Sequence, residues 1–269
     1  PLDTQYEHED GWLPEQASAQ ETFDFIVSEL NDIKGKCGDN IEMGKINNYA
    51  VHTMLAKMYL NHNAWMRDHS DNSWYGKAIE ECNAIINSGK FSLANSYSDN
   101  FKEDISGSPE IIFGIPFENK YGGGNYMANM WMHEAGRATW QFNGWATGGA
   151  AVHPQFLETY DPDDSRYGEC WIEGPQYDYA GNPIYLGNEQ LNYGRELHSI
   201  DNPGCYPMES ARLIKYEIIG GDFGTSYDDV PFFRYADVLM IKAECLLRLG
   251  GYNGESEQVA ADLVTQVRQ

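Results

Sequence analysis

Hydrophobic positions in the first part of the chain recur at helical spacing. Ser18 and Glu21 form a capping box, and the apolar residues behind it predict a helix over about 19–34. A second helix is expected over about 45–61. The third has a wide apolar stripe and stops before Gly89, a residue suited to the position just after a helix. Its stripe consists of Trp74, Tyr75, Ala78, Ile79, Cys82, Ile85 and Ile86.

The helical pattern then gives way to a long irregular region. The apolar run at 110–115 predicts a short strand, which Pro116 ends or places on a sheet edge. From Tyr121 to about Asp229 no regular period is present, and Gly, Asn, Asp, Pro and aromatic residues dominate. A loop region of this length inside a compact chain usually carries function.

Helical spacing returns near the C-terminus. It begins at Tyr235 and closes at Gly250-Gly251, and Ser256 caps a last helix. We therefore expect a mainly α, single domain over 1–269. Tetratricopeptide-like helix pairs form its scaffold, and a few short strands accompany a long, loop-rich insert. The two helix pairs lie too far apart in sequence for a tandem array. The scaffold covers about 18–92 and 230–269, and the ligand-binding insert about 115–229.

Charge narrows the range of partners. The 269 residues carry a formal net charge of −23, which argues against nucleic acid and against basic adhesion to anionic lipid. Disorder is not expected, because 42% of the residues are hydrophobic and 13% are aromatic. No apolar run is long enough for a membrane-spanning helix. The first residues, Pro1-Leu2-Asp3-Thr4, and a C-terminus in mid-helix pattern lead us to expect a piece of a longer chain.

The five cysteines form no C-x-x-C pair. Cys82 and Cys245 lie on apolar helix faces and are expected to be buried. A bridge between Cys170 and Cys205 stays open as an interpretation.

Aromatic and amide residues cluster at the start of the insert. Between Tyr121 and Ala150 the only Asp, Glu, Lys or Arg residues are Glu134 and Arg137. Aromatic faces cover the apolar faces of sugar rings, and amides pair with sugar hydroxyls at a lower desolvation cost than charges. The expected glycan-binding residues are Trp131, Trp140, Trp145, Tyr121, Tyr126, Asn125 and Asn143.

Other aromatic and charged residues have structural interpretations. Trp74 is expected in the core, and Trp65 in a loop where it packs. Arg234 and Glu244 are charges within an apolar helix pattern, so we expect a buried or half-buried ion pair or a bond to a helix end.

The candidate catalytic and metal-binding motifs each lack one or two of the residues that they require. His133-Glu134 begins like H-E-x-x-H, but Arg137 occupies the second ligand position. The segment from Asp161 resembles a calcium loop, but Arg166 and Ile172 replace the required Gly and Glu. An irregular calcium site stays open. No cofactor and no resident metal are expected.

Four sequence blocks resemble the SusD/RagB family of outer-membrane glycan-binding lipoproteins. Residues 230–244 read VPFFRYADVLMIKAE, where the family has Arg-Tyr-Ala-acid-Val-Leu followed by Ala-Glu. Three further blocks resemble the family and occur in its order. One comprises 50–60, Trp74, Ala78 and residues within 85–93, and the next comprises Phe101 and 109–113. The last comprises 156–160 and Asp164-Ser165-Arg166. The last block has Ser where the family usually has Pro.

The resemblance implies a non-catalytic protein at the cell surface. Such proteins capture oligosaccharide or polysaccharide and cover a TonB-dependent SusC-like transporter in the outer membrane. The family's lipid-carrying N-terminal cysteine and its C-terminal segment are missing from this sequence. The expected lipid anchor therefore belongs to the full-length protein. Two alternatives remain: a glycoside hydrolase using a carboxylate pair on a helical scaffold, and a helical-repeat adaptor for peptides.

Overall fold

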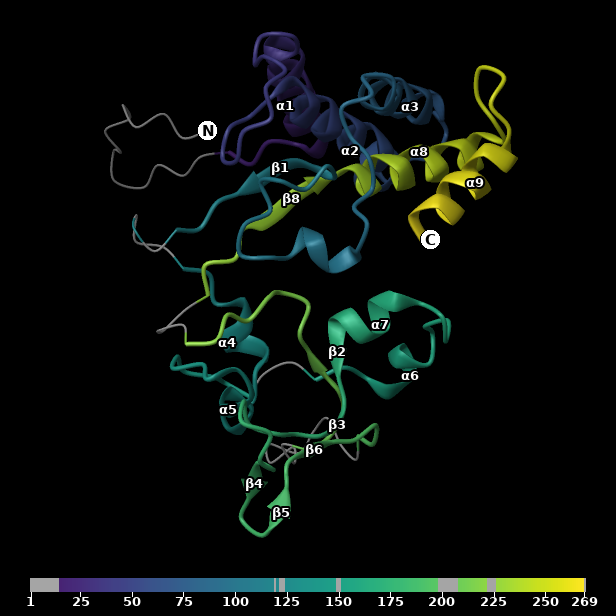
Figure 1. Cartoon of the computed structure of the whole chain (residues 1–269). Helices are drawn as coiled ribbons and strands as arrows, with labels where there is room; N and C mark the ends of the chain where they lie inside the picture. Colours follow the sequence, from purple (N-terminus) through teal and green to yellow (C-terminus); the bar gives the residue numbers. More distant parts are fainter. Residues whose placement is uncertain are drawn as a thin grey trace.

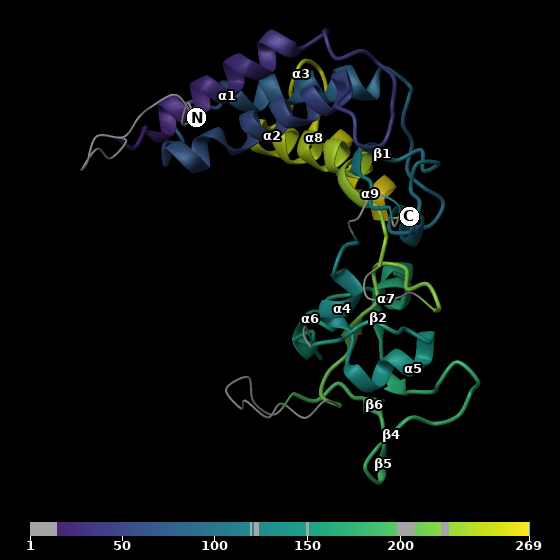
Figure 2. The same ribbon diagram turned by 90° about the vertical axis from the view of Figure 1, so that its left-hand side faces the viewer.

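The structure is a computed structural model that describes residues 15–118, 120, 124–148, 151–197, 208–221 and 226–268. A helical layer lies above a loop-rich layer, and Figures 1 and 2 show the two from perpendicular directions. The helical layer confirms the mainly α expectation. Its helices are α1 (Ala19–Ile33), α2 (Asn48–Met66), α3 (Ser73–Ile86), α8 (Tyr235–Leu249) and α9 (Glu257–Arg268).

Side-chain caps set where two of these helices begin. Ser18 Oγ accepts from the amide of Glu21, and the Glu21 carboxylate accepts from the amide of Ser18, as the capping-box pattern predicted. Asn47 caps α2 by accepting from the amide of Ala50 at 2.9 Å. Its Nδ2 also donates to the carbonyl of Ile112 at 2.9 Å, so the same side chain ties α2 to the strand below it.

The second helix differs from its expected range. It starts at Asn48 and runs to Met66, so the predicted end near Asn61 is wrong. Arg67 ends the helix in a left-handed conformation, with φ at 55°. Trp65 consequently lies on the last turn of α2 and is 48% exposed, which corrects the expectation that it packs in a loop. The polar residues before it are compatible with a helix, and no Gly or Pro interrupts them.

The core joins segments from both ends of the chain. Helix α3 packs against α2 and α8, and α8 packs against α9. Cys82 and Cys245 are fully buried, as expected, and burial raises the pKa of the Cys245 thiol to about 12. Trp74 packs at the edge of this core, with its ring centroid 5.3 Å from that of Phe23. The predicted core role of Trp74 is confirmed.

One two-stranded ribbon connects the two layers. Strand β1 (Ile111–Ile115) pairs antiparallel with β8 (Val230–Arg234), with Ile115 opposite Val230 and Ile111 opposite Arg234. The insert therefore leaves the scaffold and returns to it at neighbouring points. Pro231 has no N–H to donate, which is tolerated because the described residues place no further strand beside β8.

Inside the insert the elements are short. The helical turns are α4 (Met127–Trp131), η3 (Glu134–Gly136), α5 (Arg137–Trp140), α6 (Pro154–Leu157) and α7 (Ser165–Cys170), and η1 (Tyr97–Asn100) precedes the ribbon. Three antiparallel pairs of two-residue strands complete it: β2 (Trp171–Ile172) with β7 (Arg212–Leu213), β3 (Gly174–Pro175) with β6 (Asn192–Tyr193), and β4 (Tyr185–Leu186) with β5 (Glu189–Gln190). Cys205 lies outside the described residues.

The two charges expected to be buried behave differently. Arg234 is the last residue of β8, and its Nη1 donates to Glu110 at 2.8 Å, with the Glu110 side chain 5% exposed. Glu110 also accepts from the amide of Ala94 and from Asn100 Nδ2. The ion-pair expectation therefore holds for Arg234. Glu244 pairs with Arg248 one turn later on α8, and its side chain is 46% exposed, so this ion pair is half-exposed rather than buried.

A buried carboxylate links three helical elements and predicts a pH-dependent contribution to stability. Glu81 on α3 accepts from Lys34 Nζ at 2.9 Å and from His52 Nδ1 on α2. Burial raises the pKa of Glu81, but the bonds from His52 and Lys34 outweigh burial and hold it below its usual range. A depressed folded pKa stabilises the fold above the unfolded pKa, and this stability is lost as pH falls through the folded pKa.

We expect Glu81→Gln to lower the free energy of unfolding by roughly 1–3 kcal/mol at pH 7. The difference from the parent should shrink as the pH falls through the depressed pKa of Glu81, because the parent carboxylate then becomes neutral too. Urea unfolding at pH 7, 4 and 3 measures both quantities. Glu29→Gln, on the exposed face of α1, is the matched control and should change little. An equal loss at every pH would contradict the role given to the Glu81 charge.

Candidate functional site

Two exposed aromatic rings lie side by side at the start of the insert. Tyr126 directly precedes α4, and its ring centroid lies 5.6 Å from that of Trp145, with 34° between the ring planes. Tyr126 is 52% exposed and Trp145 is 48% exposed. Met130, one helical turn after Tyr126, is 55% exposed. We call Tyr126, Met130 and Trp145 the aromatic platform.

Hydrogen bonds from α4 hold the loop that carries Trp145. Asn129 is fully buried, and its Nδ2 donates to the carbonyl of Trp145 at 2.8 Å. The amide of Thr147 donates to Asn129 O at 3.1 Å, and Thr147 Oγ1 donates to Met130 O at 2.9 Å. The amide of Gly148 donates to Met132 O at 3.0 Å. The position of the Trp145 ring therefore depends on backbone bonds rather than on burial of the ring.

A second set of bonds shapes the turn between α5 and Trp145. Gln141 ends α5 in a left-handed conformation with φ at 53°, and Phe142 is buried under the turn. Arg137 Nη1 donates to the carbonyl of Gly144 at 2.7 Å. The same guanidinium lies 3.3 Å from the carboxylate of Glu134. The two charged residues of this part of the insert thus compensate each other, and the platform itself consists of uncharged side chains.

The remaining expected tryptophans are half-buried. Trp131 lies against Tyr216, with 5.9 Å between ring centroids. Trp140 packs beside the small cluster of Ala128, Met132 and Phe142. Each therefore contributes more to the packing of the insert than to an open surface.

The two expected asparagines differ in exposure. Asn143 is exposed, and its Nδ2 donates to Gly221 O at 3.3 Å. Asn125 is 6% exposed, and Nδ2 donates to Asp228 O while Oδ1 accepts from the amide of Met127 and from Ser226 Oγ. The side-chain amide of Asn125 therefore bonds to other residues of the protein, and the expectation that it faces a ligand does not fit its position. Tyr121 lies outside the described residues.

A carboxylate-rich cavity of about 470 Å³ lies beside the ribbon, where the insert begins and ends. Burial raises the pKa of Asp229, and the nearby charges of Asp104 and Glu118 add to that rise. Ser106 lowers the pKa of Asp104 through hydrogen bonds. Two carboxylates with pKa values moved in opposite directions are the pattern that acid–base catalysis uses. Asp229, however, accepts from the amides of Ile105 and Phe117 at 3.3 and 3.1 Å, which gives it a role in holding the two segments together.

No group of three or more His, Cys, Asp or Glu residues in the described ranges is arranged to hold a metal ion. Within the same ranges, none of the helices combines the length and the apolar character needed to cross a bilayer.

The structure is a mainly α scaffold that carries a loop-rich insert with an open aromatic platform, and comparison with known proteins identifies the family. The model of the SusD family matches residues 86–269, and the chain therefore belongs to the SusD family. A curated relative, SusD-like protein P38 from Formosa agariphila, is 24% identical over 282 residues, covering 97% of this chain and 50% of the relative.

Solved structures share the fold. A SusD superfamily protein from Parabacteroides distasonis has a TM-score of 0.71 at 17% identity, covering 96% of this chain and 53% of the other. Surface glycan-binding protein A from Bacteroides thetaiotaomicron, in complex with laminarihexaose, has a TM-score of 0.69 at 18% identity, covering 94% and 55%. This chain thus spans about half the length of the relatives it matches.

The bond from Asn129 to the Trp145 carbonyl generates a prediction about the platform. Asn129→Ala removes a buried hydrogen bond and should cost roughly 1–3 kcal/mol of stability. The loss should be local, because α4 and its loop are remote from the helical core. Hydrogen exchange followed by mass spectrometry should show faster exchange over 144–148 and unchanged protection in α3 and α8. Uniform loss of protection across the chain would contradict the pinning role of Asn129.

Proposed function

We propose that this chain binds a neutral oligosaccharide or polysaccharide on the aromatic platform and does no chemistry on it. The observation that carries the proposal is the exposed Tyr126–Trp145 ring pair, fixed by α4 yet left uncovered on its outer side. Large aromatic side chains usually bury their surface, so two adjacent rings near half exposure mark a surface available for binding.

The chemistry of the platform favours a sugar over other ligands. A pyranose ring offers an apolar C–H face and a rim of hydroxyl groups, and an aromatic face can cover the former. Asn143 is exposed near the end of the same turn and can pair with hydroxyl groups. The net charge of −23 disfavours polyanions, and the uncharged platform offers no counter-charge to attract them. Binding should therefore depend little on salt.

Family membership supports a proposal for where in the cell this binding takes place. We infer that the full-length protein is anchored by lipid at the outer surface of the outer membrane. There it would deliver glycan to a TonB-dependent SusC-like transporter. The laminarihexaose complex of the Bacteroides thetaiotaomicron protein makes a glucan a reasonable first ligand to test on this chain.

Glycoside hydrolysis is the second candidate, and the cavity at Asp229 is the observation in its favour. The oxygens of Asp229 already accept two backbone hydrogen bonds, whereas a general acid must present its proton to the leaving group. A structural role, in which Asp229 holds two chain segments together, explains this carboxylate more simply than catalysis does. Binding without hydrolysis is the function that we favour.

Trp145→Ala is expected to weaken glycan binding about 10- to 150-fold, since a large apolar contact contributes roughly 1.5–3 kcal/mol. Its melting temperature should stay near that of the parent, because an exposed ring leaves no cavity when removed. Trp65→Ala is the matched control, with the same exposed fraction on α2, and should bind as the parent does.

Trp74→Ala is expected to do the opposite of Trp145→Ala: it should lower the stability of the protein rather than its affinity for glycan. It removes a side chain packed in the helical core and should cost roughly 3–5 kcal/mol of stability. A glycan array identifies ligands, and calorimetric titration of laminarihexaose together with thermal melts supplies the numbers. If Trp145→Ala binds every glycan as well as the parent, or unfolds the protein, the platform is not the binding site.

Incubation with a bound glycan should leave its length distribution unchanged. Chromatography of laminarihexaose after prolonged incubation with the purified chain measures this. Time-dependent release of shorter sugars that Asp229→Asn abolishes, while Asp163→Asn does not, would favour the hydrolase over the binding protein.

A further inference from the structure

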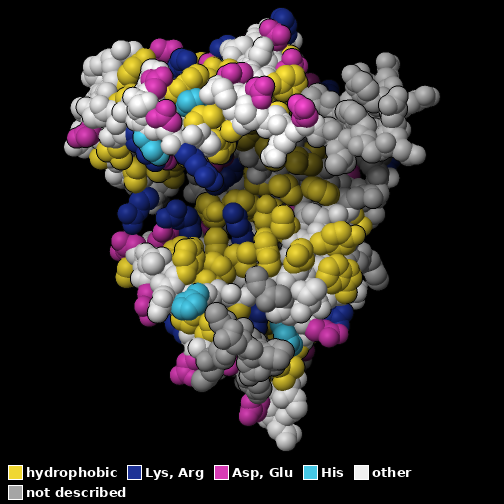
Figure 3. Space-filling model, turned by 180° about the vertical axis from the view of Figure 1, so that it is seen from behind, with side chains coloured by type: hydrophobic (Ala, Val, Ile, Leu, Met, Phe, Trp, Pro, Cys, Tyr) yellow, Lys and Arg dark blue, Asp and Glu magenta, His cyan; other side chains and the backbone are white. Residues whose placement is uncertain are grey.

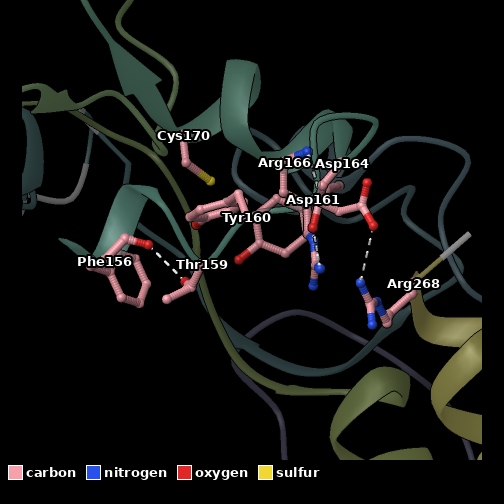
Figure 4. Close-up of a pocket in the computed structure, with 9 residues that line it drawn as sticks. Phe156, Thr159, Tyr160, Asp161, Asp164, Arg166, Cys170 and Arg268 are labelled. Carbon is pink, nitrogen blue, oxygen red and sulfur yellow. Dashed lines mark hydrogen bonds and ion pairs between the residues drawn. The ribbon is translucent and has the colours of Figure 1, made fainter. Parts of the chain in front are cut away.

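A second cavity lies on the other side of the insert from α4, between α6, α7 and the end of α9 (Figure 4). Its volume is about 370 Å³, and it adjoins a cavity of about 410 Å³ that shares Tyr97, Asp164, Arg166 and Arg268. Volumes of this size lie at the lower end of those of small-molecule sites, which are roughly 300–1,000 Å³. Asp161 and Asp164 belong to the segment for which an irregular calcium site was left open, but no group of three or more His, Cys, Asp or Glu residues in the described ranges is arranged to hold a metal ion.

Aromatic side chains form one wall of the cavity. Phe156 is 50% exposed, and its ring centroid lies 5.7 Å from that of Tyr160, with the planes nearly perpendicular. Tyr160 is fixed from behind, because Trp171 Nε1 donates to its hydroxyl at 3.1 Å. Phe156 also lies 6.2 Å from Trp171. The rings are thus held by one another while Phe156 keeps half of its surface uncovered.

Two ion pairs of different strength form the opposite wall. Arg166 binds Asp164 through two bonds, Nε–Oδ1 at 2.8 Å and Nη2–Oδ2 at 2.5 Å, and the Asp164 side chain is 9% exposed. Asp161 and Arg268 form a looser pair. Their nearest atoms are 3.9 Å apart, and both side chains are more than half exposed. Figure 4 shows Arg268 reaching from α9 toward Asp161. Asp161 Oδ1 also accepts from the amide of Asp163 at 3.2 Å, and the other donors and acceptors of the loose pair are available for a ligand. Those of the tight pair are used within the pair.

The charges of the cavity balance. Two carboxylates, of Asp161 and Asp164, face two guanidinium groups, of Arg166 and Arg268. Burial raises the pKa of Tyr97 to about 12 and that of Cys170 to about 11. Figure 3 shows Lys and Arg side chains gathered on the α7 and α9 side of the hollow between the two layers, in a chain whose net charge is strongly negative. Within the cavity itself each guanidinium lies beside a carboxylate, so the lining offers both hydrogen-bond donors and acceptors, with equal numbers of opposite charges.

We propose that this cavity is a second saccharide site, which takes the end of a neutral glycan. Phe156 and Tyr160 cover one face of the terminal sugar ring. The Asp161 carboxylate accepts from its hydroxyl groups, and the Arg268 guanidinium donates to its oxygens. Thr159 Oγ1 donates to Phe156 O at 2.7 Å, so its lone pairs are free to accept from a further hydroxyl.

This inference rests on the proposed function, because it assumes that the ligand class is the same at both places. Two sites on one molecule let a long glycan bind more tightly than a short one without any new kind of contact. Since Asp161 lies in the insert and Arg268 in α9, an occupied cavity also links the two layers. Ligand binding at this site should therefore stabilise the fold as well.

The experiment uses laminaribiose, laminarihexaose and the corresponding α-1,4- and β-1,4-linked glucose oligomers on the parent and on single variants. Calorimetry should give two disaccharides bound per chain. Phe156→Ala and Arg268→Gln should each weaken one of the two binding events about tenfold and leave the other unchanged. Phe25→Ala and Asp163→Ala are the matched controls. Phe25 has the same exposed fraction on α1, and Asp163 is an exposed neighbour of Asp161.

The outcomes separate this site from the platform. One disaccharide per chain, lost in Trp145→Ala and unaffected in Phe156→Ala, overturns the second site and leaves the proposed function standing. Binding lost in Phe156→Ala and Arg268→Gln but kept in Trp145→Ala supports the second site and overturns the platform. Binding of no oligomer by the folded parent overturns both.

Discussion

The antiparallel pairing of β1 with β8 is the interaction on which the rest of the structure depends. It brings together two segments that lie more than one hundred residues apart in sequence, and buried carboxylates secure both ends of the junction. Glu110 binds Arg234 at one end, and Asp229 accepts from the amides of Ile105 and Phe117 at the other. Because the entropy cost of closing a loop rises only slowly with its length, a long insert adds little to the cost of this closure.

The scaffold could be predicted from the sequence because its signals are local. A capping box, an apolar stripe and a closing glycine each act within a few residues, and α1, α3 and α8 begin and end close to where these signals place them. The end of α2 was missed because Arg67 provides a left-handed residue without being glycine. The degree of burial of Glu244 could not be predicted, because an acidic residue within an apolar pattern has the same sequence appearance whether it is buried or half-exposed.

The surfaces of the insert were harder to predict, since exposure there depends on contacts between distant residues. Composition identified the segment rich in aromatic and amide residues, but it could not separate Trp145 from Trp140. One ring is exposed because Asn129 holds the backbone beneath it, and the other is half-buried against Met132 and Phe142. The wall of Phe156 and Tyr160 was visible only as part of a family motif. A spacing of four residues between two aromatics near a polar turn was the signal that could have drawn attention to it.

The ribbon also has a consequence for how such proteins diversify. A scaffold that closes on itself through β1 and β8 places one geometric demand on the intervening chain, namely that its two ends meet at the spacing of paired strands. Insertions, deletions and wholesale replacement within the insert can satisfy that demand without altering the packing of α2, α3 and α8. The chain between β1 and β8 can therefore change in length and sequence while the packing of the helical frame stays the same.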